Sequence, residues 1–294
     1  MADATTSNFG FTKPEVGASE DSWGAKLNNN WDSIDALMAK AIQHTGQCRL
    51  ILDAGVLKLV RVNGRYLWCN GELCTVPATP VSLAATGLSV GTIYFIYAVQ
   101  TSGVITSLEA STTARATHTD GTQIKSGDSS RALVGMARVG TGPAWYDQAG
   151  IRYLRSWHND LGIRVFTVFG GTVGTSSSSL VELYSAARAH FIYWANEVML
   201  FSLGGTVTIP AGGQLASAAI YLNGSTDIVA GYYARYQGDG DDASGGYAKP
   251  LSRSGSYQLG SSDAYAYATV MGTVSGGGTA NFNMIQDMVL RGVK

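Results

Sequence analysis

One serine of this sequence stands in the pattern of a hydrolase nucleophile. Residues 87–91 read Gly-Leu-Ser-Val-Gly, which matches the Gly-x-Ser-x-Gly elbow of α/β-hydrolases, where a strand precedes the serine and a helix follows it. After Ser89, however, residues 92–99 are rich in β-branched and aromatic side chains and predict a strand. We therefore interpret residues 87–91 as a polar loop that enters a strand, and we assign no catalytic nucleophile.

Three carboxylates fall within four positions of one short stretch. Asp239, Asp241 and Asp242 lie among glycines, and hard cations such as Ca²⁺ take several oxygen ligands from loops of this kind. The glutamate that would complete an EF-hand does not follow. Both a calcium site and a solvated turn stay open for this loop. We predict no metal site, with these three aspartates as the one candidate.

The histidines and cysteines define neither a catalytic triad nor a zinc site. The four histidines are scattered through the chain, and no pair of them has ligand spacing. Cys69 and Cys74 flank Asn70-Gly71, a strong signal for a two-residue hairpin turn, which places the two thiols diagonally on one face of a strand pair. Diagonal neighbours are too far apart for an unstrained disulfide. We predict reduced thiols, no cofactor and no enzymatic activity.

The composition is typical of a turn-rich β protein with uncharged polar surfaces. Only 14% of the 294 residues are charged, against about a quarter in average proteins, and there are 37 glycines and 15 tyrosines. The net charge of −1 creates no field that would attract nucleic acid or an anionic membrane. No apolar run approaches the roughly 18 residues that span a bilayer, and the N-terminus lacks the features of a signal peptide. We expect no nucleic-acid partner, no membrane insertion and assembly in a cytoplasm.

Only one part of the sequence, residues 22–42, has a sustained helical pattern. Pro14 and Gly17 favour extended or turn backbone before it. Its apolar residues recur at steps of three or four along one stripe: Trp23, Leu27, Trp31, Ile34, Leu37, Met38, Ala41 and Ile42. Because the asparagines at 28–30 weaken the helix, we expect another surface to cover this stripe, and copies of the same chain are one candidate.

From residue 48 onward the sequence predicts antiparallel β-structure. Short alternating or aromatic runs are separated by turn residues such as Asn63-Gly64. A cluster of serine and glycine between residues 156 and 179 indicates a boundary, and about eight further strands follow it, which suits a jelly roll or a similar two-sheet sandwich. We predict a mainly β protein with an N-terminal segment that contains the helix (1–47), a middle β-sandwich domain (48–160), a linker or first strand (161–179) and a C-terminal, jelly-roll-like sandwich (180–294).

Three stretches of the sequence resemble proteins of tailed bacteriophages. The first resembles the attachment region of tail-fibre and other virion appendage proteins, through Lys13, Pro14, Gly17, Trp23, Gly24, Leu27, Asn28, Ile34 and Asp35. Six separated blocks between Leu67 and Ala137 resemble a β-domain that recurs in tail fibres. A looser resemblance to the C-terminal heads of fibres runs from Glu182 to Thr206, although residues 263–267 lack the Gly-Tyr-His that such heads often carry.

This resemblance implies a structural virion protein: a homotrimeric tail fibre that docks on the particle through its N-terminus and presents its C-terminal head to the host surface. Attachment or trimer packing would be carried by Lys13, Pro14, Gly17, Trp23, Leu27, Trp31 and Ile34. The partners would be other copies of the chain, tail or portal-proximal virion proteins, and host cell-surface polysaccharide. Two other functions stay open: a head-decorating fibre or tail adaptor that contacts only virion proteins, and a glycan-degrading tail spike.

Tyrosine is concentrated in the C-terminal region. Tyrosine rings stack on sugar faces and provide rigid contact area with one polar end. Such side chains either contact a receptor or pack within the sheets and a trimer core, and the sequence does not decide between the two. The candidates for receptor contact are Tyr232, Tyr233, Tyr236, Tyr247 and Tyr257.

Overall fold

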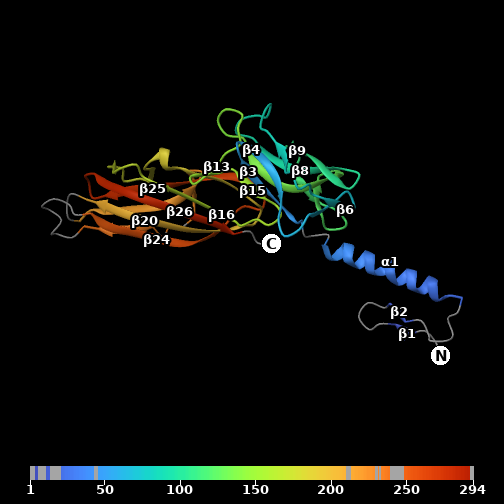
Figure 1. Cartoon of the computed structure of the whole chain (residues 1–294). Coiled ribbons are helices and arrows are strands. Elements are labelled where there is room, and N and C mark those ends of the chain that lie inside the picture. Colours follow the sequence, from blue (N-terminus) through green and yellow to red (C-terminus); the bar gives the residue numbers. More distant parts are fainter. Residues whose placement is uncertain are drawn as a thin grey trace.

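The protein is mainly β, as its composition and turn spacing predicted. The computed structural model describes residues 4–5, 11–13, 21–42, 46–209, 213–228, 231, 233–238 and 248–291, with the side chains of 35–42 excepted. Figure 1 shows two β-bodies joined end to end, with the helix α1 (Trp23–Ile42) projecting from the first of them. The short strands β1 (Ala4–Thr5) and β2 (Thr12–Lys13) lie beside α1. The helix occupies the residues that the apolar stripe predicted.

The first β-body packs a three-stranded sheet on an eight-stranded one. Its strands are β3 (Cys48–Asp53), β4 (Val56–Arg61), β5 (Tyr66–Cys69), β6 (Glu72–Thr75), β7 (Val81–Leu83), β8 (Ile93–Thr101), β9 (Val104–Ser111), β10 (Arg115–Thr117), β11 (Gln123–Lys125), β12 (Asp128–Arg138) and β15 (Leu154–Ser156). The small sheet has the order β3-β4-β7, and the large one β10-β11-β12-β8-β9-β6-β5 with β15 also on β12. Side chains alternate along β3 and β4, so Leu50, Leu57 and Leu59 are buried in one core with Ile96 and Val134.

The second β-body is also built from two sheets. Its elements are β13 (Asp147–Gln148), β14 (Ile151–Arg152), β16 (Ile163–Val168), β17 (Val173–Thr175), β18 (Val181–Glu182), the 3₁₀ turn η1 (Ser185–Ala187), β19 (Ala189–Tyr193), β20 (Val198–Thr208), β21 (Leu215–Leu222), β22 (Thr226–Asp227), β23 (Ala234–Gln237), β24 (Lys249–Gln258), β25 (Ala264–Ser275) and β26 (Ala280–Arg291). One sheet has the order β13-β14-β19-β25-β21-β22, with β18 on β25 and β23 on β21. The other has the order β16-β26-β20-β24, with β17 on β26.

The strand order of the second β-body is that of a jelly roll. Its longer strands β16, β19, β20, β21, β23, β24, β25 and β26 can be numbered one to eight along the chain. One sheet then reads 1-8-3-6 and the other 2-7-4-5, which is the double Greek key of that fold. The buried residues of both sheets, among them Phe191, Phe201, Ile220 and Phe282, form a single core. The predicted jelly-roll-like sandwich is confirmed by this order.

Strand pairing crosses the segments expected from the sequence at two places, and one strand was not expected. β13 and β14, inside the expected middle domain, join the second β-body, where β14 pairs in parallel with β19. β16 and β17, inside the segment expected to be a linker or first strand, pair with β26. β24 was not expected as a strand. Since it lies at a sheet edge and exposes mostly small polar side chains, it lacks the alternation that signals a strand.

The two β-bodies meet at a junction that buries charge as well as apolar groups. The Arg155 side chain of β15 is fully buried, and its Nη1 lies 2.6 Å from Oε2 of Glu197 in the second body. Arg115 of β10 donates two hydrogen bonds to Asp263, at 2.7 and 3.1 Å. Around these pairs the buried cluster draws on both bodies and comprises Phe95, Tyr97, Leu133, Met136, Ile192 and Trp194, with Trp157 packed against it. The two bodies are therefore packed together as one unit.

Candidate functional site

The tryptophans of α1, predicted to carry attachment or trimer packing, keep most of their surface in water. Trp23 is 53% exposed and Trp31 is 60% exposed, although indole rings are highly buried on average. Leu27 and Ile34 of the same stripe are half-buried. α1 therefore presents two large apolar side chains that a further surface could remove from water.

An asparagine of α1 holds the extended N-terminal segment beside the helix. The Asn30 amide donates through Nδ2 to the Thr12 carbonyl at 2.7 Å, and its Oδ1 accepts from the Thr12 amide at 3.0 Å. One side chain satisfies both backbone groups because an amide carries a donor and an acceptor. Lys13 lies in β2, which pairs with β1, so this part of the predicted attachment segment is extended along its own helix. Pro14 and Gly17 lie outside the described residues.

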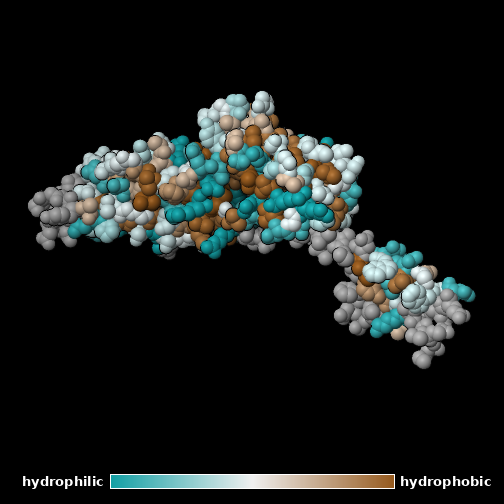
Figure 2. Space-filling model, viewed as in Figure 1, coloured by the Kyte–Doolittle hydropathy of each residue, from teal (hydrophilic) through white to brown (hydrophobic). Residues whose placement is uncertain are grey.

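The outer face of one sheet in the second β-body exposes a row of apolar side chains. Along β16, β20 and β26, residues that face the core alternate with residues that point to solvent. Outward positions of a sandwich are normally polar. Here Val168 and Ile285 are paired across the sheet, and half of each is exposed (50% and 49%). Figure 2 shows apolar surface over these strands, and its exposed residues are Phe166, Val168, Val198, Leu200 and Ile285.

The tyrosines predicted to contact a receptor do not gather at one place. Tyr233, Tyr236 and Tyr257 each pack part of their ring on the core of the second β-body. Tyr236 lies near the start of β24, where Lys249 Nζ is 5.7 Å from its ring centroid. Tyr257 lies eight residues further along that strand, roughly 27 Å away. Receptor contact stays a prediction, and Tyr236 and Tyr257 lie too far apart to belong to one small contact site. Outside the described residues lie Tyr232, Tyr247, Asp239, Asp241 and Asp242.

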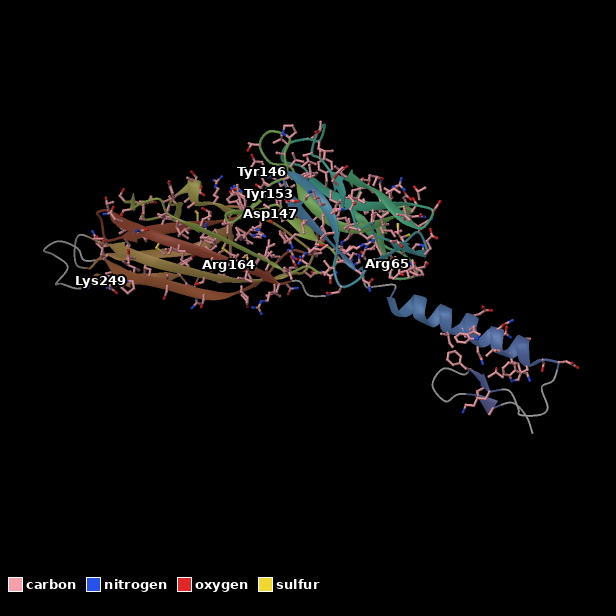
Figure 3. All side chains as sticks on the ribbon, viewed as in Figure 1. Arg65, Tyr146, Asp147, Tyr153, Arg164 and Lys249 are labelled. Atoms are coloured by element: carbon pink, nitrogen blue, oxygen red, sulfur yellow. The ribbon has the colours of Figure 1, made fainter. Side chains whose placement is uncertain are left out.

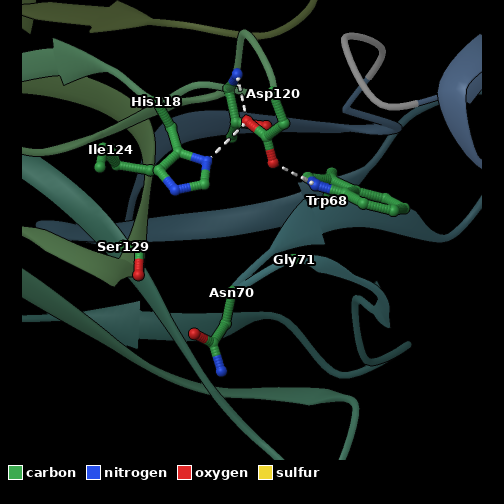
Figure 4. Close-up of a pocket in the computed structure, with 8 residues that line it drawn as sticks. Trp68, Asn70, Gly71, His118, Asp120, Ile124 and Ser129 are labelled. Carbon is green, nitrogen blue, oxygen red and sulfur yellow. Dashed lines mark hydrogen bonds and ion pairs between the residues drawn. The ribbon is translucent and has the colours of Figure 1, made fainter.

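A pocket of about 110 Å³ in the first β-body is built around a carboxylate (Figure 4). Asp120 accepts hydrogen bonds from Trp68 Nε1 at 3.0 Å and from the Thr122 amide at 2.9 Å, and His118 Nδ1 lies 3.0 Å from its Oδ1. Although burial alone would raise the pKa of Asp120, these hydrogen bonds lower it well below its usual range. The carboxylate is charged and already engaged. It therefore positions Trp68 and His118 and cannot serve as a general acid.

A second pocket, of about 240 Å³, lies where the two β-bodies meet. Arg49 of β3 lines it from the first body, and Asp147 and Arg152 line it from β13 and β14. Arg152 Nε lies 2.8 Å from Asp147 Oδ1. Burial raises the pKa of Asp147 to about 6, and the charge of Arg152 opposes this shift. A carboxyl at the junction therefore changes its charge just below neutral pH.

Ser89 lies in the loop before β8, as predicted, and a strand follows it where a hydrolase elbow requires a helix. Its amide donates to the Tyr94 hydroxyl at 3.0 Å. Among the described residues, no group of three His, Cys, Asp or Glu side chains could hold a metal ion. No helix in the described part of the chain is both long and apolar enough to cross a bilayer. The described histidines have the following partners: Asp120 for His118, the Gly46 amide for His158, and Tyr265 for His190.

The exposed sheet face and the junction pocket were not anticipated from the sequence. The face had a local signal, because residues 163–168 are rich in β-branched and aromatic side chains and, when extended, place Phe166 and Val168 on one side. That signal was missed because the surrounding serines and glycines led us to interpret residues 161–179 as a linker or first strand. The junction pocket had no such signal, since Arg49 and Asp147 are brought together from strands almost a hundred residues apart.

Comparison with known proteins does not assign this chain to a family. No family model matches this sequence, and no curated protein matches it. Among solved structures it is similar to the VP2 subviral particle of infectious bursal disease virus (11% identity, 53% of this chain and 39% of that chain, TM-score 0.29). It is also similar to a structure of the Gx strain of that virus (12% identity, 84% and 66%, TM-score 0.31) and to an insecticidal delta-endotoxin of Bacillus thuringiensis (8% identity, 84% and 52%, TM-score 0.29). The chain spans less than two thirds of each of these proteins, and similarity at this level carries no argument about function.

Proposed function

We propose that this protein is a structural component of a virion, a homotrimeric tail fibre of a tailed bacteriophage that docks on the particle through its N-terminal segment. The observation that carries the proposal is the exposure of Trp23 and Trp31 on a helix that projects from the β-bodies (Figure 1). A tryptophan has roughly 150–250 Å² of surface to bury. At about 25 cal/mol per Å², covering the exposed halves of both rings would contribute about 5 kcal/mol. The resemblance of residues 13–35 to phage attachment segments supports a virion protein as the surface that covers them.

The exposed apolar face of the second β-body supports association with further copies. Contiguous apolar surface on a soluble protein marks an interface. We propose a second and a third copy of this chain as the occupants, with the number three taken from the resemblance to fibres. Arg164 and Asp287, 2.7 Å apart on the same face, would supply polar contacts beside Phe166 and Ile285. The interface between copies would thus combine an apolar centre with an adjacent ion pair, as protein interfaces commonly combine an apolar core with a polar rim.

The arrangement of the chain supports a division between docking and recognition. α1 lies at one end of the molecule, and the jelly roll extends to the other (Figure 1). In this proposal the head binds host cell-surface polysaccharide without turnover, and the fibre is assembled in the host cytoplasm. Three heads on one fibre would convert weak individual contacts into strong overall binding, because each later contact forms at a high effective concentration.

The proposal is tested by changing Trp23→Ala together with Trp31→Ala and measuring the fibre content of purified phage particles. We expect the β-bodies to remain folded, because neither indole belongs to a core, while incorporation into particles falls at least about tenfold. That fall follows from losing about 5 kcal/mol of burial, which greatly exceeds the roughly 1.4 kcal/mol for a factor of ten.

The matched control is Val90→Ala with Leu161→Ala, which removes two exposed apolar side chains from the β-bodies and leaves α1 intact. The control should be incorporated normally. Particles that contain normal amounts of the double tryptophan variant would show that the exposed rings do not dock on the virion.

A further inference from the structure

A third pocket, of about 190 Å³, opens beside the junction and is lined by aromatic rings around one arginine. Figure 3 shows Tyr146 and Tyr153 close together where the two β-bodies meet. Arg138 comes from the end of β12 and enters the pocket between the loop before β8 and these rings. The residues that line the pocket are Val90, Gly91, Arg138, Val139, Gly140, Thr141, Tyr146, Ile151 and Tyr153.

Arg138 has no carboxylate partner within the described part of the chain. Its guanidinium carbon lies 4.8 Å from the Tyr153 ring centroid and 4.1 Å from that of Tyr265, and its buried Nε makes no hydrogen bond. Cation–π contacts of this kind replace only part of the hydration that a buried cation loses. Four other arginines in this part of the molecule are paired with carboxylates: Arg115 with Asp263, Arg152 with Asp147, Arg155 with Glu197 and Asp160, and Arg188 with Glu182.

The neighbouring groups leave the charge of Arg138 uncompensated. His190 Nδ1 lies 2.7 Å from the Tyr265 hydroxyl, and the two rings are stacked. Burial lowers the pKa of His190, and the charges of Arg138 and Arg188 lower it further. The imidazole is therefore neutral at physiological pH. The pocket thus offers one positive charge, on Arg138, to an anion that enters it.

The shape of the pocket depends on two glycines. A Cβ on Gly140 would collide with the ring of Tyr146, so this ring can lie against the backbone only where there is no side chain. Gly91 has a φ of +77°, which favours glycine, and a Cβ there would lie 3.4 Å from Arg138 Nη2. Gly140 therefore lets the Tyr146 ring lie against the backbone at the pocket wall, and the pocket volume suits one sugar ring rather than a chain of them.

We propose that this pocket binds an acidic saccharide, with its carboxylate on the Arg138 guanidinium and its ring against Tyr146 and Tyr153. The planar guanidinium matches a carboxylate with two parallel hydrogen bonds. Tyrosine rings supply apolar faces for the C–H side of a sugar and hydroxyls for its polar edge. The proposal rests on the recognition part of the proposed function and gives it a ligand class. It also places a site at the junction, away from the tyrosines of the distal strands.

The test is calorimetric titration of the purified full chain with glucuronic acid, galacturonic acid and N-acetylneuraminic acid, and with glucose and galactose as uncharged counterparts. We expect at least one acid to bind at least about tenfold more tightly than its neutral counterpart, since hydrogen bonds to charged groups are the stronger ones. Arg138→Gln should weaken binding of that acid at least about tenfold. Arg65→Gln removes the same charge from an exposed position at the far side of the first β-body (Figure 3) and should leave binding unchanged.

Tyr146→Ala gives a second route if Arg138→Gln fails to fold, because Tyr146 is half-buried at the pocket wall, and it too should weaken binding of the acid. Equal binding of acid and neutral sugar, or normal binding by both variants, would overturn the site. If inorganic phosphate binds as tightly as the acid sugar, the proposed contacts to the sugar ring are overturned. The Trp23→Ala, Trp31→Ala variant should bind the acid normally, so failure of the docking proposal and failure of this site give different results.

Discussion

At the scale of single residues, Asp147 carries its carboxyl in surroundings that disfavour its charge. Burial raises its pKa to about 6, despite the nearby charge of Arg152. An acid whose pKa is higher in the folded than in the unfolded protein favours folding while it is protonated. That contribution is complete below about pH 4 and is lost as the pH rises through 6. Asp147 therefore reduces the stability of the junction at neutral pH.

We predict that Asp147→Asn, which stays neutral at every pH, gains stability relative to the parent protein as the pH rises from 4 to 7. The gain should reach at most about 3 kcal/mol, since one pKa unit corresponds to about 1.4 kcal/mol. Denaturant unfolding at several pH values measures it. The control Asp53→Asn removes an exposed carboxyl whose pKa is lowered by its hydrogen bond to Lys58, so it should show no such gain across this range. A constant difference between Asp147→Asn and the parent would contradict the raised pKa.

The residue-level predictions that relied on local geometry are confirmed. Asn70 and Gly71 have φ of 57° and 75°, as a tight hairpin turn requires, and they join β5 to β6. Cys69 and Cys74 are buried free thiols, with Cys74 Sγ 3.6 Å from the Cys69 carbonyl oxygen. The turn and the diagonal placement of the two thiols both depend on six consecutive residues. Long-range contacts were therefore not needed to predict them. The unpaired state of Arg138 could not be foreseen, because it depends on which carboxylates lie near it in space.

At the scale of secondary-structure elements, the outward face of β16, β20 and β26 makes a prediction about assembly. Solution mass measurement should give three times the 30.9 kDa of one chain. Ile285→Glu places a charge beside Val168 in the exposed apolar row, and half of the Ile285 side chain is already in water. We expect the variant to fold and to have the mass of a single chain, because burying an unpaired carboxylate in an interface costs several kcal/mol.

The control for that prediction is Leu161→Glu, which introduces the same charge at a residue that is 83% exposed and lies outside the apolar row. It should keep the mass of the parent protein. If Ile285→Glu also keeps that mass, the face is not the interface between copies.

How well an element could be predicted depended on how strongly its pattern differed between its two faces. The stripe of α1 is wide and rich in tryptophan, so its bounds followed from the sequence. Gly204 and Gly205 stand in the middle of β20, where a pair of glycines resembles a turn in the sequence. In the structure both pair across the sheet, Gly204 with Ile285 and Gly205 with Met284. Glycine marks a turn or a close approach of two backbones, and sequence alone does not separate these.

At the scale of the whole molecule, the junction couples the two β-bodies through buried charge. Arg155 and Glu197 have side-chain exposures of 0% and 2%, and Glu197 also accepts a hydrogen bond from the Trp194 amide at 2.9 Å. Removing one partner of a buried pair leaves the other without compensation, at a cost of about 3–5 kcal/mol. Asp160 would remain beside Arg155, which places the expected cost at the lower end of that range.

We predict that Glu197→Gln lowers the free energy of unfolding by about 3 kcal/mol and divides a single unfolding transition into two. Tryptophan fluorescence reports on Trp157 and Trp194 at the junction once the chain's four other tryptophans are replaced by phenylalanine in both proteins, and circular dichroism reports on the sheets. In the variant the fluorescence change should come first. Glu72→Gln makes the same substitution at an exposed side chain and should shift neither signal. Coincident transitions with the parent midpoint would mean that the pair does not hold the bodies together.

The contacts at the junction were the part of the fold that could not be predicted from the sequence. Its pairs join residues far apart in the chain, such as Arg155 with Glu197 and Arg115 with Asp263, and hydrophobic patterning predicts burial without naming the partner. Residues 156–179 were interpreted as a boundary because serine and glycine cluster there. In the structure Asp160 pairs with the buried Arg155 instead. The jelly roll could be predicted because the number and spacing of its strands are visible in the sequence without any knowledge of which strands pair.

The pairing registers of the jelly roll bring three strand connections to the same end of the second β-body. Thr208 pairs with Asn281, Val207 with Lys249, and Leu215 with both Ser275 and Gln237. The connections between β20 and β21, between β23 and β24, and between β25 and β26 therefore all leave the sheets at the tip opposite the junction. Longer or different connections would cost little chain entropy and disturb no described strand pair. Under the proposed function, the surface offered to a host could change through these three stretches alone, while the scaffold and its assembly stay the same.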